Sequence, residues 1–530
     1  MTYYKDLRDH IKALEAKGKL VRVRREINKD TELQPLVRWQ FRGLPAEQRK
    51  AFLFENVVDV KGKKYNMPVL VAALAASKEV YAIGMMCEPE KIMERWDKAQ
   101  ANPIEPRMVK DGPVHEEVHM GDKLLEHGGL GELPITISTP GFDNAPYLTA
   151  PCWVSKDPET GVSNIGAYRA MIKSPTRTGI CARYPQHLGA HWRKCKELGK
   201  PLQAAIIVGS SPNVGYVAVS KVPYDVSEYG VAGGIAGEPV ELVKCLTVDI
   251  EVPATAEIVI EGEFPTDFVE REAPFGEAPG YMGAKKISPY FNVTCITHRK
   301  DAIYNSWISQ MPPSESSVLR GVANEAAHFH FLKHSLSVPG LKDVAFHEES
   351  GSHQLCVVSL KKVDTAQVWR ALHGVAAYTS THSKLVIVVD DDINPHDIDS
   401  VMWAVIYRMQ ADTDIRVLPR VRHAALDPSA APSEETIDRA PTATLLIDAT
   451  RKWPFPPLSL PKKEFMEKAK QIWEELGLPP LKPKVPWFGY SLGYWSKEDA
   501  EEAELALKGE HYQTGEKLAK QRVSSQGQPV

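Results

Sequence analysis

Two glutamates lie five positions apart in the stretch "EREAPFGEAPGY", residues 270–281 of this 530-residue chain. Pro274 fixes one backbone dihedral and Gly276 permits a tight bend, so the segment is predicted to be a loop rather than a helix. A loop can direct the carboxylates of Glu272 and Glu277 to one point, which suits acid–base chemistry. For an isolated pair, two solvated glutamates on a surface turn are the simpler interpretation, because loops usually expose their charges.

Three other local patterns favour structural roles over chemistry. The glycines of "GVAGGIAGEP" (230–239) lack the G-x-G-x-x-G spacing of a dinucleotide loop, so close helix packing explains them better. The acidic triplet 390–392 follows an apolar run, where helix capping and solvation are favoured over a metal or ligand site. His328 and His330 lack the HExxH glutamate, and packing is their expected role.

Histidine spacing gives one further metal hypothesis. Cysteine spacing argues against two other features, a disulfide framework and a thiolate zinc site. His187 and His191 are four apart, which could place two zinc ligands on one helix face, although a third ligand would still be needed. The seven cysteines are odd in number and never paired as CxxC, which argues against a disulfide framework and a thiolate zinc site.

Composition excludes several classes of protein. With 43% hydrophobic and 25% charged residues, the chain is typical of a globular protein. A net charge of -4 with mixed signs argues against a general nucleic-acid binder. No apolar run of about 18 residues is present, and the polar start lacks a signal sequence, so we expect no membrane span and a cytoplasmic location.

The elements that must position these residues fall into four regions. Residues 1–115 begin with a helix over 5–18 and the alternating strand "LVRVRREI", which indicates an α/β segment. Short β-rich runs dominate 116–320 and predict a barrel or sandwich, with one helix at "GEPVELVKCL". The runs taken as strands are "NIGAYRAMI", "QAAIIVGSS", "VGYVAVSKV", "AEIVIEGEF" and "FNVTCITHR".

The α/β pattern returns in residues 321–450. A helix at "VWRALHGVAAY" and a buried strand at "KLVIVVDDD" are followed by Asn394 and Pro395, the expected cap and first residue of a helix through "VMWAVIYRM". The Pro-rich tail, 451–530, contains an amphipathic helix at 462–476 that should dock on the body or on another subunit.

Several motifs together carry a resemblance to a known family. Asn164, Arg169 and His187 are followed by "PYDVSEY" with Glu228, by "VKCLTVDIEVPATAEIVIEGEF" and by "EAPFGEAPGY". This ordered set resembles the UbiD family of reversible decarboxylases. The N-terminal "DLRDHIKALEAKGKLVRV" and the C-terminal "VIVVDDDINPHDIDSVMWAVIYRM" are similar to the same family. The resemblance implies an N-terminal α/β segment, a central flavin-reductase-like split β-barrel and a C-terminal α/β domain that mediates homodimers or homohexamers.

The resemblance also implies a cofactor site. Asn164, His187 and Glu228 would bind Mn²⁺ or Mg²⁺, which clamps the phosphate of prenylated FMN with K⁺ or Na⁺ nearby. A hard cation with amide, carboxylate and imidazole ligands is chemically reasonable. Gln186 is expected to contact the cofactor and Lys384 to approach its phosphate. A flavin prenyltransferase would supply the cofactor.

In the family pattern, Glu272, Arg169 and Glu277 form a Glu-Arg-Glu network over the flavin. The planar fork of donors on Arg169 can hold a substrate carboxylate and a glutamate together. Glu277 is then expected to deliver the proton that replaces CO₂, and Glu272 to orient Arg169. The prenylated flavin supplies the electron sink that carbanion chemistry requires.

The expected activity is therefore that of a carboxy-lyase, the reversible, non-oxidative decarboxylation of an aromatic or heteroaromatic carboxylic acid. An aromatic acyl-coenzyme A thioester such as phthaloyl-CoA is an alternative substrate, since no linear motif names the ring. A split-barrel flavin reductase and a non-catalytic flavin-binding protein are alternatives of another class. The complete Glu-Arg-Glu set disfavours both.

Overall fold

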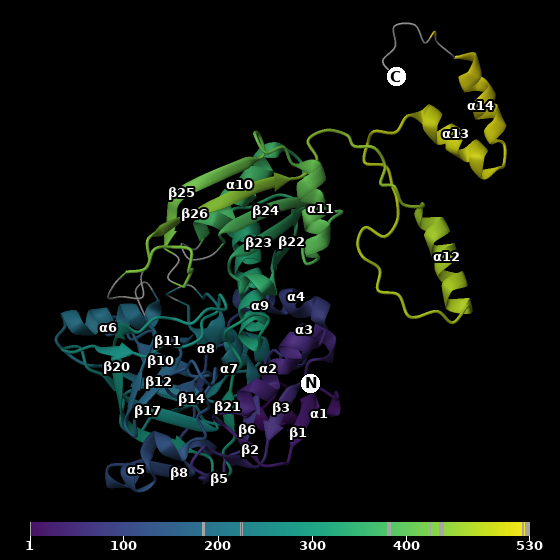
Figure 1. Cartoon of the computed structure of the whole chain (residues 1–530). Helices are drawn as coiled ribbons and strands as arrows, with labels where there is room; N and C mark the ends of the chain where they lie inside the picture. Colours follow the sequence, from purple (N-terminus) through teal and green to yellow (C-terminus); the bar gives the residue numbers. More distant parts are fainter. Residues whose placement is uncertain are drawn as a thin grey trace.

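The computed structural model describes residues 2–182, 186–222, 224, 226–378, 383–423, 426–433, 439–521 and 524. A large lower body contains the N-terminal and central segments, and a smaller α/β unit lies above it (Figure 1). Helix α9 (Glu315–His330) runs between the two. The fold is thus mixed α/β, as the sequence predicts, with α9 between its two parts.

The N-terminal segment pairs short strands with amphipathic helices. Helix α1 (Leu7–Ala16) is capped by the Asp6 side chain and buries Leu7, Ile11 and Leu14, and β1 (Leu20–Val23) follows it, so both expected elements are confirmed. The remaining elements are β2 (Ile27–Asn28), α2 (Leu33–Gly43), η1 (Ala46–Gln48), β3 (Ala51–Phe54), β4 (Val57–Val58), β5 (Lys64–Tyr65), β6 (Val69–Val71), α3 (Lys78–Met85), η2 (Pro89–Lys91) and α4 (Ile92–Ala101).

The central segment forms a curled nine-stranded sheet, a half-barrel that confirms the predicted barrel. Its order is β11-β10-β14-β17-β20-β13-β12-β9, with β8 pairing β20. The strands are β8 (Glu117–Met120), β9 (Tyr147–Leu148), β10 (Cys152–Lys156), β11 (Ser163–Ala167), β12 (Ala170–Ser174), β13 (Arg177–Gly179), β14 (Leu202–Val208), β17 (Ile258–Phe264) and β20 (Tyr290–His298).

Shorter elements surround this sheet. They are β7 (Arg107–Met108), η3 (Pro113–His115), α5 (Asp122–Glu126), η4 (Gly129–Glu132), α6 (His187–Glu197), α7 (Pro212–Val219), α8 (Glu228–Ala236), β15 (Glu241–Lys244), β16 (Glu251–Pro253), β18 (Glu270–Glu272), β19 (Lys286–Ser288) and β21 (Tyr304–Ser306).

Two local sequence assignments in this region are wrong. "VGYVAVSKV" is not a strand, because Pro212 begins helix α7 there and nearly every residue of that helix is buried. "GEPVELVKCL" is not a helix. Helix α8 ends at Ala236, Gly237 adopts the left-handed conformation that terminates it, and the segment continues as strand β15. A fully buried helix carries no polar face, so its apolar run cannot be told from a strand by periodicity.

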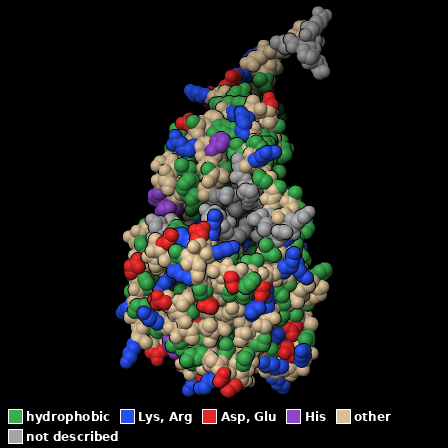
Figure 2. Space-filling view, turned by 90° about the vertical axis from the view of Figure 1, so that its left-hand side faces the viewer, with side chains coloured by type: hydrophobic (Ala, Val, Ile, Leu, Met, Phe, Trp, Pro, Cys, Tyr) green, Lys and Arg blue, Asp and Glu red, His purple; other side chains and the backbone are tan. Residues whose placement is uncertain are grey.

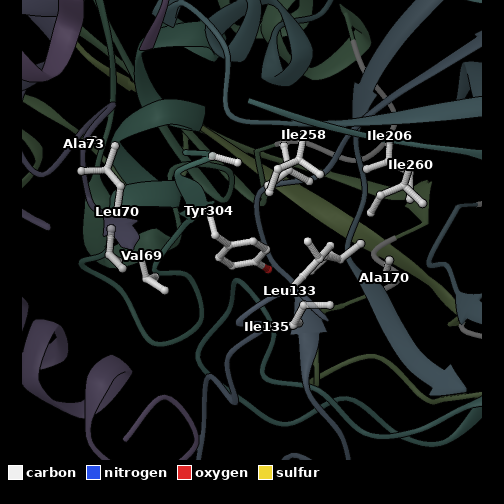
Figure 3. Close-up of a cluster of buried hydrophobic side chains, with 14 of the residues drawn as sticks. Val69, Leu70, Ala73, Leu133, Ile135, Ala170, Ile206, Ile258, Ile260 and Tyr304 are labelled. Carbon is white, nitrogen blue, oxygen red and sulfur yellow. The ribbon is translucent and has the colours of Figure 1, made fainter. Parts of the chain in front are cut away.

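The N-terminal segment and the half-barrel share one apolar core. Strand β21 follows the barrel in sequence but pairs in parallel with β6, and Tyr304 aligns with Val69. Figure 3 shows Tyr304 between Val69 and Leu70 on one side and Ile258 on the other. All four side chains are buried. The two regions are therefore packed together without a solvent layer.

The upper unit has a five-stranded sheet of order β22-β23-β24-β26-β25, with apolar clusters on both faces. The expected helix at "VWRALHGVAAY" and strand at "KLVIVVDDD" are confirmed. Asn394 does not cap the next helix, because that helix begins at Ile398 with Asp397 as its cap. The elements are η5 (Phe331–Ser335), a π-helix, β22 (Leu341–Phe346), η6 (Glu348–Ser350), β23 (Leu355–Leu360), α10 (Thr365–Tyr378), β24 (Leu385–Asp390), α11 (Ile398–Arg408), β25 (Ile415–His423) and β26 (Pro441–Ala449).

The surface carries charged side chains of both signs. Lys and Arg side chains are interspersed with Asp and Glu side chains over the lower body on the face that Figure 2 shows. Within the described residues, no helix combines the length and the apolar character needed to cross a membrane.

The tail forms three helices that lie apart from the body (Figure 1). They are α12 (Lys463–Glu475), α13 (Lys497–Leu507) and α14 (His511–Lys520). The amphipathic helix expected from the sequence is present as α12, but docking on the body of the same chain is not observed: Phe465 is 41% exposed and Ile472 is 47% exposed. An apolar face of this kind in water suggests cover by another subunit.

We expect a chain ending at Pro461 to form a smaller oligomer and to unfold at a lower temperature, because the tail helices then cannot cover a second copy. Light scattering and thermal unfolding measure the two effects. Phe465→Asp with Ile472→Asp should act like the truncation, whereas Lys463→Asp with Lys470→Asp, on the opposite face of α12, should not. Unchanged size and midpoint in the truncated chain would contradict docking.

Candidate active site

A cavity of about 580 Å³ lies between the half-barrel and the upper unit, with α9 forming part of its wall. Its lining comes from the barrel strands, the loop after β18, helix α9 and the upper unit. Six of the eight predicted site residues line it: Asn164, Arg169, Gln186, His187, Glu228 and Glu277. Residues distant in the sequence are therefore brought to one cavity.

Arg169 is the centre of the first cluster. It lies between β11 and β12, and its Nε and Nη2 donate to Glu272 Oε1 and Oε2 at 3.4 and 3.1 Å. Its Nη1 donates to Glu277 Oε1. Both glutamates are buried, so the surface-turn interpretation of this pair is wrong. One guanidinium thus holds the two carboxylates through different nitrogens, as a planar fork of donors allows.

The loop that carries Glu277 is fixed by its own backbone and by its neighbours. Glu277 N donates to the Tyr281 carbonyl at 2.8 Å, and Gly280 N donates to the Glu277 carbonyl at 2.9 Å. The tight turn lies at Gly280, where φ is +93°, and not at Gly276. Gly276 is needed for a different reason, because a Cβ there would lie 2.2 Å from the Gln310 side chain.

Burial and neighbouring charges shift the pKa values of Arg169 and Glu272, and the two glutamates differ in whether they line the cavity. Burial lowers the pKa of Arg169, but nearby Cys181, Glu277 and Glu272 raise it well above the usual value, so the guanidinium stays charged. Burial raises the pKa of Glu272, and the Arg169 charge opposes the shift. Glu277 lines the cavity, and Glu272 is not among the lining residues. Of the two glutamates, only Glu277 is therefore placed to meet a bound molecule directly.

The second cluster joins Asn164, His187 and Glu228. His187 Nδ1 lies 2.7 Å from Asn164 Oδ1 and 3.9 Å from Glu228 Oε1. His187 and Glu228 are the first residues of α6 and α8, and Asn164 lies on β11. Helix N-termini favour anions, which suits a phosphate beside a cation.

The donor set of this second cluster fits a hard divalent cation. Burial raises the pKa of Glu228 to about 8. Asn164 Nδ2, a donor, is buried without a hydrogen-bond partner in the described part of the chain, and it suits an anionic oxygen such as that of a phosphate. Burial, assisted by the charge of Lys221, lowers the pKa of His187, which keeps its imidazole neutral for ligation. A cation here would compensate the buried carboxylate, as Mn²⁺ or Mg²⁺ does with oxygen ligands.

Two residues, Lys384 and His191, lie in other surroundings than the sequence predicted. Lys384 is not among the residues lining the cavity, and its Nζ donates to Asp427 Oδ2 at 3.0 Å and to Ser429 Oγ at 2.7 Å. The zinc pair of His187 with His191 is not formed, because His191 Nδ1 lies 3.0 Å from Ser155 Oγ on the buried side of α6.

The weaker sequence patterns are structural. A Cβ on Gly233 or Gly234 would lie 2.3 or 2.6 Å from backbone oxygens at Ile104 or Ala99, which confirms close helix packing. In the acidic triplet, Asp390 and Asp392 form ion pairs with the buried Arg408 instead of capping a helix.

Sequence reasoning did not identify the wall that α9 contributes. Arg320 and Asn324 line the cavity from this helix, one turn apart. Arg320 Nη2 is buried with no hydrogen-bond partner among the described residues, and burial lowers the pKa of Arg320 to about 10. Two polar residues at helical spacing within the apolar run "VLRGVANEAA" were the available signal.

Comparison with known families matches most of the chain, from residue 11 to residue 449 with short gaps. Models described as the 3-octaprenyl-4-hydroxybenzoate carboxy-lyase N-terminal, Rift-related and C-terminal domains (UbiD_N, UbiD and UbiD_C) match residues 11–100, 107–312 and 317–449. An uncharacterized protein of Aquifex aeolicus is 32% identical over 90% of this chain and 99% of its own.

Solved structures give the same relationship. The UbiD-class enzyme HmfF from Pelotomaculum thermopropionicum, an evolved dimeric form in complex with prFMN, is 32% identical with a TM-score of 0.76, covering 88% of this chain and 100% of that chain. Vanillic acid decarboxylase of Sedimentibacter hydroxybenzoicus in its closed form is 26% identical with a TM-score of 0.78, covering 89% and 100%.

We expect Glu228→Ala or His187→Ala to lose a bound divalent metal and flavin together while the chain stays folded, because the phosphate charge is then uncompensated. Metal analysis, the flavin absorbance and circular dichroism measure the three properties. Glu238→Ala, an exposed glutamate just beyond α8, is the matched control. Full flavin occupancy in both variants would contradict the metal-clamp assignment.

Proposed function

Because the chain belongs to the UbiD family of carboxy-lyases, we propose that it is a prenylated-FMN-dependent decarboxylase of an aromatic or heteroaromatic carboxylic acid. The observation that carries the proposal is the shared guanidinium of Arg169, held by Glu272 and Glu277 in the wall of the cavity that also contains the Asn164, His187 and Glu228 cluster. A group suited to a carboxylate and a group suited to a phosphate thus line one cavity.

The second cluster is proposed to hold the cofactor. Asn164, His187 and Glu228 would ligate Mn²⁺ or Mg²⁺, whose charge compensates the cofactor phosphate, with K⁺ or Na⁺ nearby. Gln186 lines the same cavity as the N-cap residue of α6 and would contact the cofactor. Lys384 would approach the phosphate only after leaving Asp427. When bound, prenylated FMN supplies the electron sink for the carbon that loses CO₂.

The first cluster is proposed to handle the substrate and its proton. Arg169 would bind the substrate carboxylate through its fork of donors, and Glu272 would hold that fork in place. Glu277, which faces the cavity, would hold the proton and deliver it to the carbon from which CO₂ leaves. In the carboxylation direction the same carboxylate would take the proton away, so the chemistry is reversible.

Arg320 narrows the substrate class. Its buried Nη2 lacks a partner in the described part of the chain and belongs to the cavity lining, with Glu277 as the opposite charge that acts on it. A buried donor of this kind favours a substrate with a second acceptor, such as another carboxylate or a carbonyl. A ring diacid and an aromatic acyl-CoA thioester both offer one.

A split-barrel flavin reductase or a non-catalytic flavin-binding protein is a weaker proposal on this fold. Neither function requires two carboxylates bound to one buried arginine. Supply of the cofactor by a flavin prenyltransferase and assembly into a homodimer or homohexamer are parts of the proposal. The exposed apolar face of α12 supports the assembly.

We expect protein produced with a flavin prenyltransferase to release CO₂ from a panel of aromatic acids, and protein loaded with plain FMN to release none. Within the panel, acids with a second acceptor should be preferred over the matching mono-acids, and Arg320→Met should remove that preference. CO₂ release and product formation are measured for each acid. Equal turnover with plain FMN would contradict the decarboxylase proposal.

We expect Glu277→Gln to lower turnover by about 10²- to 10⁴-fold, because the amide keeps the shape of the carboxyl but cannot exchange a proton. Cofactor occupancy should be unchanged. Glu270→Gln is the matched control, since Glu270 lies two residues before Glu272 and pairs with Lys173 and Arg177 instead. Deuterium incorporation from D₂O into product at the parent rate in Glu277→Gln would contradict the assignment.

A further inference from the structure

Three histidines and a glutamate gather on the barrel away from the active-site cavity. His119 lies on β8, His127 follows α5, Glu132 ends η4, and His298 ends β20. None of the four lines the cavity. Figure 1 shows α5 and β8 at the end of the lower body opposite the upper unit. The proposed decarboxylation uses none of these residues.

Strand pairing and two glycines bring the group together. His119 pairs with Ile296 across β8 and β20, and His298, two residues further along, lies on the same face of the sheet. Gly128 and Gly129 turn the chain back after α5 with φ of +88° and +55°. Leu130 N then donates to the Pro175 carbonyl at 2.8 Å, which fixes the turn that carries Glu132.

The side chains already touch. His119 Nδ1 lies 2.9 Å from Glu132 Oε2, and the His119 and His127 rings are stacked with centroids 3.7 Å apart. One ligand atom each from His119, His127 and Glu132 lies within 4.8 Å of the others. Ligand atoms around tetrahedral zinc are about 3.3 Å apart. The exposed His127 can close the difference by rotating its side chain.

His298 provides an independent indication of a ligand. It is 6% exposed, and its ring lies edge-on to His119 with centroids 5.1 Å apart. Its Nδ1 lies 2.7 Å from the Arg299 carbonyl, so Nδ1 carries the hydrogen and Nε2 is left as an acceptor. Nε2 is buried with no hydrogen-bond partner among the described residues. Histidines that bind metals commonly donate their other nitrogen to a backbone carbonyl in this way.

The charges around Glu132 also favour a cation. Its side chain is 11% exposed. Lys63 Nζ donates to the Gly131 carbonyl at 2.6 Å and makes no ion pair with Glu132 in the described part of the chain.

A second histidine cluster is a poorer candidate. His330 and His334 both contact Asp97, but the ammonium of Lys333 lies 3.3 Å from the same carboxylate. That lysine already supplies a positive charge to Asp97. The cluster is therefore interpreted as a surface ion-pair network between α4 and the end of α9.

We propose that His119, His127, Glu132 and His298 form a structural zinc site that fastens the segment between β8 and β9 to the barrel. Three imidazole nitrogens and one carboxylate oxygen are ligands that zinc accepts, whereas Ca²⁺ and Mg²⁺ prefer oxygen alone. Four protein ligands leave no position for a substrate, which indicates a structural and not a catalytic ion.

The test is whether the whole chain keeps its zinc through chelator treatment and gel filtration. The parent protein and Glu228→Ala should each retain one equivalent of zinc at this site, since Glu228 belongs to the separate cofactor cluster. His127→Ala and Glu132→Gln should bind zinc more weakly by at least the roughly 10- to 100-fold that loss of an outer-shell partner costs, and should lose the zinc-dependent rise in unfolding temperature. Metal analysis, competition with a chromophoric chelator and thermal unfolding are the readouts.

His115→Ala is the matched control, because this nearby imidazole pairs with Asp111 and is outside the cluster. It should retain zinc like the parent. Since His127 is exposed, its replacement should leave the fold intact, and circular dichroism checks this. No zinc retained by Glu228→Ala, or equal zinc affinity in His127→Ala and the parent, would overturn the proposal.

Discussion

The buried guanidinium of Arg169 constrains the rest of the active site. A cation enclosed by protein needs bound carboxylates, and removing one partner of such a buried pair typically costs about 3–5 kcal/mol. Glu272 and Glu277 meet this requirement from a strand end and from the following loop. The close packing of Gly276 against Gln310 and the turn at Gly280 then hold that loop in one position. The Glu277 carboxylate is thus positioned by charge compensation as much as by backbone geometry.

The second cluster also depends on charge compensation, but here the buried charge is negative. Glu228 is a buried carboxylate without a lysine or arginine ion pair in the described part of the chain, and its raised pKa reflects that lack of compensation. The N-termini of α6 and α8 place His187 and Glu228 where a cation and an anionic ligand would complete the balance. The upper unit contributes through α9, whose buried Arg320 completes the other wall of the cavity.

Local sequence was a good guide where an element has one polar and one apolar face. Helix α1, helix α12 and strand β1 were predicted correctly because their periodicity is visible. The same approach failed for α7 and β15. Helix α7 is buried on nearly all sides, and the chain beyond Gly237 forms strand β15 because it pairs with β7 and β16. Such choices depend on neighbours that no local window contains.

The sequence by itself determined which residue types were available and in what order: the two glutamates around Ala-Pro-Phe-Gly, the arginine, and the Asn, His and Glu set. Their order sufficed to indicate the family. Only the tertiary structure decided that Glu277 and not Glu272 lines the cavity, that Lys384 pairs with Asp427, and that α9 brings Arg320 to the site. Residue identity and spacing are local properties of the chain, whereas burial, charge compensation and the direction in which a side chain faces are set by segments that lie from tens of residues to more than a hundred residues away.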